Sequence, residues 1–218
     1  VTYQPSIGTE GTEIATEWTV RETGATAAMP VAGQIRPFVL DCDLEAGEPL
    51  DLQGVADGKL PNEIDPAKAI PACTDAMRRY PNVARFIYQL GRAQLAAKQV
   101  GEAVALFKRA YDQGHVRSAY QLGYMAQRGL GGKQNLSEAN DYFKYSALNG
   151  DPYGMLAYGR NLVMGRGTAA DVSGGIQFLN RAVEMGHTYA MNELGSMYSE
   201  GRGVERNPER GARFYQAA

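Results

Sequence analysis

The 218-residue chain lacks the features that mark several common classes of protein. No apolar run approaches the roughly 18–20 residues that a membrane-spanning helix needs, so we expect no insertion into a bilayer. Its 22 Lys and Arg residues balance 24 Asp and Glu residues, which gives a net charge of −2. Without a basic excess, nucleic acid is not an expected partner. The sequence begins at Val1 without an apolar leader, which we interpret as a mature or excised chain.

Cysteine is scarce, because Cys42 and Cys73 are the only two in the chain. They form no CxxC motif and have no neighbouring histidine to activate a thiolate, so neither catalysis nor metal binding is predicted for them. Two interpretations remain open. In one, a disulfide ties an irregular leader to the first helix, which favours a periplasmic or secreted protein. In the other, both are buried free thiols, which fits the cytoplasm.

Internal repetition is the strongest pattern in the sequence. Glycines recur every 36 residues in several series that share one phase, and a polar residue recurs in the same phase. The series are Gly114, Gly150, Gly186; Gly123, Gly159, Gly195; Gly129, Gly165, Gly201; Gly131, Gly167, Gly203; and Asn135, Asp171, Asn207. A fixed period of this length predicts helical hairpins that stack into an all-α solenoid.

Each 36-residue unit is predicted to hold two helices. Apolar residues between Ser118 and Gln127 follow helical spacing, and Gly129 ends that helix because glycine adopts a left-handed backbone at little cost. Asn135 and its equivalents stand where the second helix needs an N-cap acceptor. The large residue at the position of Phe143 is expected to fill the space that small residues leave between neighbouring helices.

Before residue 116 the period shortens to that of the tetratricopeptide repeat. The pattern Ala-x3-large-x2-Ala occurs over 69–76 and again 34 residues later over 103–110. We therefore predict tetratricopeptide-like helices over 65–115 and 36-residue units over 116–218. Residues 41–64 are predicted as an irregular lead-in to the solenoid.

The last unit carries the motif Leu194-Gly195-x-x-Tyr198-x-x-Gly201-x-Gly203-Val204, which resembles the Sel1-like repeat family. Units of this kind are visible at about 116–151, 152–187 and 188–218. The resemblance implies a right-handed superhelix of antiparallel helix pairs and a role in assembling protein complexes, with no catalytic residues. Residues 42–93 also resemble the lead-in to such repeats in larger bacterial proteins, some of which carry a caspase-like peptidase domain upstream.

Residues 1–40 are predicted as an N-terminal extension or linker. Between Glu13 and Glu22, apolar and charged residues alternate around Trp18, which favours a half-buried strand. Such a strand or hairpin would cap the end of the solenoid. The alternative is a flexible linker from an upstream domain.

No candidate catalytic, cofactor or metal site emerges from the sequence. His115 and His187 lie two periods apart with Asp151 in the same phase between them, so we predict a structural role at a helix junction. The GxG loops have no preceding strand and no following Gly-Lys-Ser/Thr, which excludes a Walker phosphate loop and leaves turn glycines.

The inner face of the superhelix is the predicted binding surface. Inward-facing positions keep a fixed offset from the Leu-Gly glycine of each first helix, and Tyr and Arg predominate there. Both residue types are favoured in binding hot spots. Transferred by register, the predicted groove residues are Arg85, Tyr88, Arg92, Arg117, Tyr120, Tyr124, Arg128, Tyr153, Arg160, Met164, Tyr189 and Asn192.

These observations predict a non-catalytic interaction module: a scaffold, adaptor or regulatory subunit that binds a protein or peptide. Because arginine pairs with carboxylates through two parallel hydrogen bonds, we expect the bound segment to carry acidic groups. The alternative is an accessory domain that recruits substrate for, or regulates, a peptidase in the same larger protein. The sequence leaves the oligomeric state open.

Overall fold

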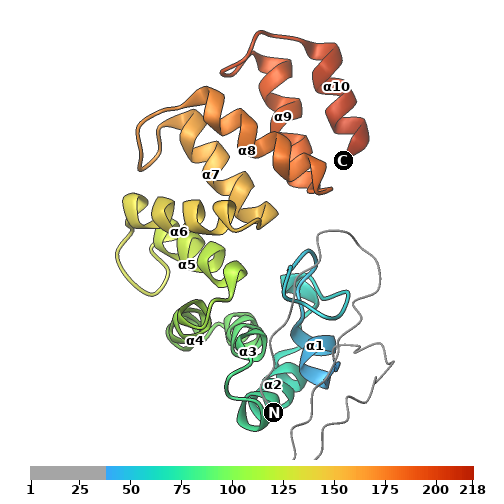
Figure 1. Ribbon diagram of the computed structural model, residues 1–218, viewed down its shortest axis with the longest axis vertical. Coiled ribbons are helices and arrows are strands. Elements are labelled where there is room, and N and C mark those ends of the chain that lie inside the picture. The colour runs from blue at the N-terminus through green and yellow to red at the C-terminus, as the bar shows by residue number, and fades with distance from the viewer. Residues whose placement is uncertain (1–37) are drawn as a thin grey trace, which may run out of the picture. The chain divides into compact units, whose positions relative to one another are not determined.

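The computed structural model describes residues 38–218, which form ten α-helices and one short 3-10 helix, with no β-strand among them (Figure 1). The strand expected near Trp18 lies outside the described residues. No helix in residues 38–218 is long and apolar enough to cross a membrane. The helices are α1 (Asp41–Ala46), η1 (Pro61–Glu63), α2 (Pro66–Arg79), α3 (Ala84–Ala96), α4 (Val100–Asp112), α5 (Val116–Arg128), α6 (Leu136–Leu148), α7 (Pro152–Met164), α8 (Val172–Glu184), α9 (Thr188–Glu200) and α10 (Pro208–Ala217).

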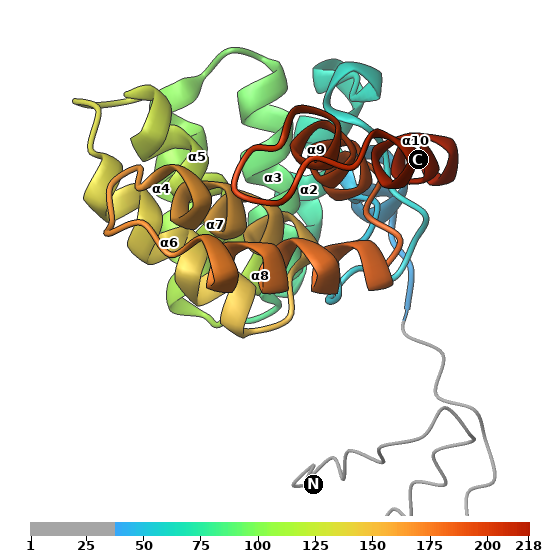
Figure 2. The ribbon, with the colours of Figure 1, turned by 90° about the horizontal axis from the view of Figure 1, so that it is seen from above.

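Helices α3 to α10 form four hairpins, α3–α4, α5–α6, α7–α8 and α9–α10. Each hairpin packs on the next through its second helix, so that α4 contacts α5, α6 contacts α7, and α8 contacts α9. Figure 1 shows the hairpins following one another along the vertical axis, and Figure 2 shows the same stack from above. This architecture confirms the predicted α-solenoid of helix pairs.

The two helices of each hairpin touch at a glycine in the first helix. A β-carbon at Gly123 would lie 2.7 Å from a ring carbon of Phe143, so this close approach requires a residue with no side chain. The other hairpins repeat the arrangement, with Gly91 against Phe107, Gly159 against Leu179 and Gly195 against Tyr215. The predicted role of the large residue in the second helix is therefore confirmed.

The turns inside the 36-residue units also repeat. Gly129, Gly165 and Gly201 end the first helices with φ of 69°, 63° and 75°, a left-handed conformation that favours glycine. The second helices begin at side chains that accept a backbone N–H three residues on, at 2.9–3.1 Å. These N-caps are Asn135, Asp171 and Asn207, as the sequence predicted.

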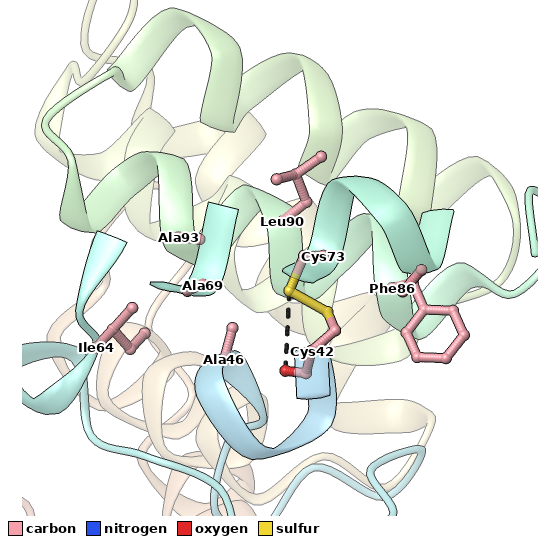
Figure 3. Close-up of a cluster of buried hydrophobic side chains, with 9 residues drawn as sticks. Cys42, Ala46, Ile64, Ala69, Cys73, Phe86, Leu90 and Ala93 are labelled. Carbon is pink, nitrogen blue, oxygen red and sulfur yellow. Dashed lines mark hydrogen bonds between the residues drawn. A yellow bond between two sulfur atoms is a disulfide. The ribbon is translucent and has the colours of Figure 1, made fainter. Parts of the chain in front are cut away.

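The start of the solenoid is fastened to the segment before it. Helix α1 packs on α2 and α3, and a disulfide joins Cys42 to Cys73 (Figure 3). Ala46, Ile64 and Phe86 belong to the same buried cluster. Residues 41–64 thus contain a short helix and a packed loop, which is more structure than an irregular lead-in.

Candidate functional site

The predicted groove residues divide into a covered part and an open part. Tyr88, Arg92 and Arg117 are only 0%, 4% and 1% exposed. The segment that covers them is the chain's own lead-in, residues 43–60, which we call the strap. The structure thereby corrects the expectation that these side chains, together with Arg85, line a surface open to a partner.

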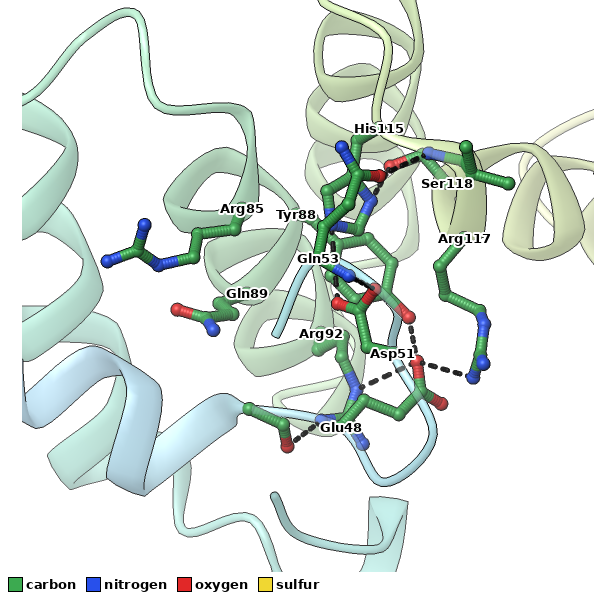
Figure 4. A network of polar contacts seen from close by, with 12 residues as sticks. Glu48, Asp51, Gln53, Arg85, Tyr88, Gln89, Arg92, His115, Arg117 and Ser118 are labelled. Atoms are coloured by element: carbon green, nitrogen blue, oxygen red, sulfur yellow. Dashed lines mark hydrogen bonds and ion pairs between the residues drawn. The ribbon is translucent and has the colours of Figure 1, made fainter. Parts of the chain in front are cut away.

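Glu48 is the central contact between the strap and the solenoid (Figure 4). Its carboxylate accepts a hydrogen bond from the Tyr88 hydroxyl and lies 3.3 Å from an Arg117 nitrogen and 4.0 Å from Arg92 Nε. Burial raises the pKa of Tyr88 well above its ordinary value, and the nearby negative charge of Glu48 raises it further. Tyr88 therefore remains a neutral hydrogen-bond donor.

Arg92 and Arg117 also hold the strap by its backbone. Arg92 donates to the carbonyls of Ala46 and Lys59 at 2.8 and 2.7 Å, and to that of Gly47. Arg117 donates to the carbonyl of Leu50 at 2.7 Å. A guanidinium group has five N–H donors, so one side chain can bind a carboxylate and main-chain carbonyls at once. The solenoid thus holds the strap by its main chain as well as by the Glu48 side chain.

Two more acidic residues of the strap are buried against the helices. Asp43 accepts hydrogen bonds from Arg85 Nε at 3.0 Å and Gln89 Nε2 at 2.9 Å. Asp51 lies 3.3 Å from His115 Nε2 and accepts from the Gln53 backbone N–H. Burial on its own would raise the pKa of Asp51, but the interaction with His115 and the Gln53 hydrogen bond outweigh it, and the pKa is lowered.

The strap is itself a closed loop. The Lys59 N–H donates to the Gly47 carbonyl at 2.8 Å, and Lys59 Nζ pairs with Glu45 at 2.6 Å. Gly58 has φ 79°, and a β-carbon there would lie 2.4 Å from the backbone of Glu48. The two limbs of the strap meet backbone to backbone, which positions Glu48 over the arginines.

Two of the three residues in the phase of His115 cap helices with their side chains. Asp151 accepts from the backbone N–H groups of Tyr153 and Gly154, and His187 Nδ1 accepts from that of Ala190 at 3.3 Å. His115 instead contacts Ser118 Oγ at 3.1 Å, through its Nδ1. No group of three metal-ligating side chains occurs in the described part of the chain.

Asp151 also completes the buried ion pairs of Arg117. Its Oδ1 lies 2.7 Å from Arg117 Nη2 and 2.8 Å from Nε, and its Oδ2 accepts from the Ser146 hydroxyl at 2.6 Å. Burial raises the pKa of Asp151 despite the opposing charge of Arg117. Burial acts to lower the pKa of Arg117, but the carboxylates of Asp151 and Glu48 together outweigh it and raise that pKa. This cluster links the strap to the second and third hairpins.

The open part of the inner face begins where the strap ends. A hollow of about 740 Å³ is lined by Tyr120, Tyr124, Tyr153 and Tyr189 on the solenoid side and by Leu60 and other strap residues opposite. Tyr189 is 65% exposed. Tyr120 and Tyr153 pack together with ring centroids 5.3 Å apart. These side chains offer a fixed aromatic surface to a ligand.

A second hollow of about 520 Å³ continues from the first along α5 and α7. Both are lined by Tyr120, Tyr124, Leu156 and Arg160, so they form one surface, which we call the open groove. The second hollow adds Arg128 of the predicted set. It also adds residues that the register did not assign to the inner face: Gln127, Gln134, Leu136, Phe143, Ala157, Asn161 and Arg166.

Besides the covered residues Arg85, Tyr88 and Arg117, two predicted residues line neither hollow. Met164 and Asn192 are exposed, and both stand outside the residues around the open groove. The depression instead extends toward the strap and the turn after α5, where Leu60 and Gln134 line it. The register alone could not locate it.

Comparison with protein families assigns the repeats. The Sel1 repeat model matches residues 116–151, 152–187 and 188–218, and a tetratricopeptide repeat model matches residues 63–126. The two matches overlap over residues 116–126.

Solved structures show the same fold. A Sel1 repeat protein from Oxalobacter formigenes superposes with a TM-score of 0.64 at 21% identity, over 71% of this chain and 63% of that one. A protective antigen of uropathogenic Escherichia coli, which displays an SLR fold, superposes with a TM-score of 0.59 at 28% identity, over 72% of this chain and 34% of that one.

One curated relative is the chitin synthase regulator SKT5 of Saccharomyces cerevisiae. It is 30% identical over 137 residues, which are 61% of this chain and 19% of the yeast protein. The chain thus spans less than two thirds of each of these relatives. It contains tetratricopeptide-like repeats and Sel1 repeats, with three Sel1 repeats over residues 116–218.

Proposed function

We propose that the chain is a non-catalytic interaction module that binds an extended segment of a protein partner in the open groove. Sel1 and tetratricopeptide-like repeat proteins are generally scaffolds for protein interactions, because stacked repeats create an extended concave surface. The observation that carries the proposal is the continuous hollow along α5, α7 and α9, with aromatic and arginine side chains at its wall.

The strap supports an extended ligand in particular. Residues 46–50 follow one another across Arg92 and Arg117, and these arginines hold main-chain carbonyls as well as the Glu48 carboxylate. A segment of a partner that enters the open groove meets side chains of the same two types. Tyr and Arg lose little conformational entropy on binding for the contact area and the hydrogen-bond donors that they provide.

A second candidate is recruitment within a larger protein. The yeast relative is named as a regulator of an enzyme, and the alignment covers only 19% of it, so a repeat region of this kind occurs as part of a longer chain. In that setting the open groove would hold a substrate or regulatory segment for a catalytic domain, such as a peptidase, of the same polypeptide.

The proposal is tested by comparing capture by matched variants. The wild-type chain, the groove variant Tyr124→Ala/Arg160→Ala and the control Lys108→Ala/Arg181→Ala would each be immobilised and exposed to the same cell extract. The control residues are exposed on α4 and α8, outside both hollows.

We expect proteins retained by the wild type and by the control to be lost from the groove variant, with unchanged helical content in circular dichroism. Retention of the same proteins by the groove variant would show that binding occurs elsewhere. Loss only in the control would place the binding surface on α4 and α8.

A further inference from the structure

The second hollow of the open groove carries charge of one sign. Arg128, Arg160 and Arg166 line it, and no carboxylate from residues 38–218 does. The remaining polar lining includes the uncharged amides of Gln127, Gln134 and Asn161. Three guanidinium groups around a space of about 520 Å³ repel one another, so an anion there is favoured.

The charges of these arginines are only partly balanced by the chain itself. Arg160 Nε lies 3.1 Å from Glu193, but the same carboxylate also pairs with Arg202 at 3.6 Å. The Arg128 guanidinium stacks over the ring of Tyr124 at 5.6 Å, a contact that supplies no negative charge. Within residues 38–218, the ion pairs of the hollow's arginines thus involve one carboxylate, and Arg160 shares it with Arg202.

The covered half of the inner face shows how such arginines are used. Arg92 follows the hairpin glycine Gly91, and Arg160 follows the equivalent Gly159. In the covered half, Arg92 and its neighbour Arg117 receive the Glu48 carboxylate and the carbonyls of the strap. Arg160 therefore occupies, in its own repeat, the position from which Arg92 contacts the strap in an earlier repeat.

We propose that the arginine-lined hollow binds the side-chain carboxylate of an Asp or Glu within the partner segment. This inference rests on the proposed function and names the chemistry of its ligand. Arginine holds a carboxylate through two parallel N–H donors, which fixes direction as well as charge. Leu156, which lines the same hollow, offers an apolar contact to a residue beside the acid.

The position of the hollow favours an acidic side chain over a terminal carboxylate. The hollow opens into the larger one along Tyr120 and Tyr124, so a bound segment continues past the arginines. The acids of the strap, Glu48 and Asp51, likewise belong to a chain that runs on in both directions.

The experiment selects ligands from random sequences, so the partner need not be identified first. Random 12-residue peptides on phage would be selected on the full chain, and synthetic copies of the binders would be measured by fluorescence anisotropy. Each peptide would also be made with its Asp and Glu changed to Asn and Gln, and separately with an amidated C-terminus.

The protein variants are the triple Arg128→Gln/Arg160→Gln/Arg166→Gln and a control that removes the same charge, Lys108→Gln/Lys144→Gln/Arg181→Gln. All six residues are exposed, so both variants are expected to retain the fold. A third variant, Tyr124→Ala/Tyr189→Ala, reports on the groove itself.

We expect selected peptides to be enriched in Asp and Glu. Their affinity should fall at least about 10-fold on conversion of the acids to amides and in the arginine variant, because each charge-assisted hydrogen bond contributes more than about 1.4 kcal/mol. C-terminal amidation of the peptide and the control variant of the protein should leave the affinity unchanged.

Three kinds of result overturn the inference and are distinguishable. Peptides that need the tyrosines but show no acid enrichment and no loss in the arginine variant would refute the carboxylate site and leave the proposed function standing. Binders indifferent to the tyrosines, or no binders at all, would refute both. A loss on amidation alone would show that the hollow takes a chain terminus instead, which also overturns the inference.

Discussion

Replacing Arg117 with methionine tests the central cluster between strap and solenoid. The side chain is 1% exposed and its guanidinium contacts Asp151 at 2.7 Å, Glu48 at 3.3 Å and the Leu50 carbonyl at 2.7 Å. Methionine keeps most of the length and removes the charge. The two carboxylates then stay buried without their cation, so we expect the free energy of unfolding at pH 7 to fall by about 3–5 kcal/mol.

The loss should depend on pH in a defined direction. Burial already raises the pKa of Asp151 against the opposing effect of Arg117, and removal of Arg117 raises that pKa further. A carboxyl group whose folded-state pKa is raised contributes its stability below the unfolded value of about 3.9, and loses it as the pH rises through the folded value. The deficit of the variant should therefore shrink as the pH falls from 7 toward 4.

The assay is urea unfolding followed by circular dichroism at several pH values. The double variant Arg117→Met/Asp151→Asn should be less destabilised than the sum of the two single variants, because it removes both members of the pair. Arg109→Met, at an exposed site on α4, serves as the control and should change stability by no more than about 0.5 kcal/mol. A deficit under about 1 kcal/mol, or one that is constant across this pH range, would contradict the ion-pair argument.

Three further predictions concern stability and use the same unfolding measurement. A thiol assay on the denatured, non-reduced chain should find no free thiol, and one or two free thiols would contradict the bridge. Cys42→Ser/Cys73→Ser should lower the free energy of unfolding by about 3–4 kcal/mol, because the disulfide closes a loop of 31 residues. Gly159→Ala should lower the free energy of unfolding by about 1–3 kcal/mol, since its β-carbon would lie 2.8 Å from a carbonyl oxygen. Gly101→Ala, where a β-carbon meets open space, should raise it by about 0.5–1 kcal/mol. Effects of equal sign would refute the packing argument. Lys98→Gly should raise the free energy of unfolding by up to about 1 kcal/mol, because Lys98 has a left-handed backbone with φ 63°, which glycine adopts more easily. A net loss of stability would show that the Lys98 side chain contributes more than its backbone conformation costs.

The helices were predictable from sequence because their determinants are local. The spacing over 118–127 predicted a helix that the structure extends to Val116–Arg128. Gly129 ends that helix, and Asn135 begins the next, through contacts within a few residues. Such signals recur every 36 residues, so each repeat confirms the interpretation of the others.

The cover over the first repeats was not predictable in the same way. Register places Tyr88 and Arg117 on the inner face, but it does not say what occupies that face. The contacts that bury them join residues 40 and 69 positions apart, as Glu48 with Tyr88 and with Arg117. With 20 acidic and 20 basic residues beyond position 40, charge complementarity selects no unique pairing. The acidic residues between 43 and 51 were the available signal, and their role required the fold.

Under the proposed function, the strap limits where a partner segment binds on the inner face. A segment tethered in the same chain faces its site at an effective concentration in the millimolar range, so a free partner of equal intrinsic affinity at lower concentration does not displace it. The disulfide between Cys42 and Cys73 adds to that advantage by fixing one end of the strap to α2. The arginines of the first repeats are therefore committed within the molecule. Under the proposed function, recognition by the inner face therefore depends on the open groove, which Arg160 and Tyr189 line.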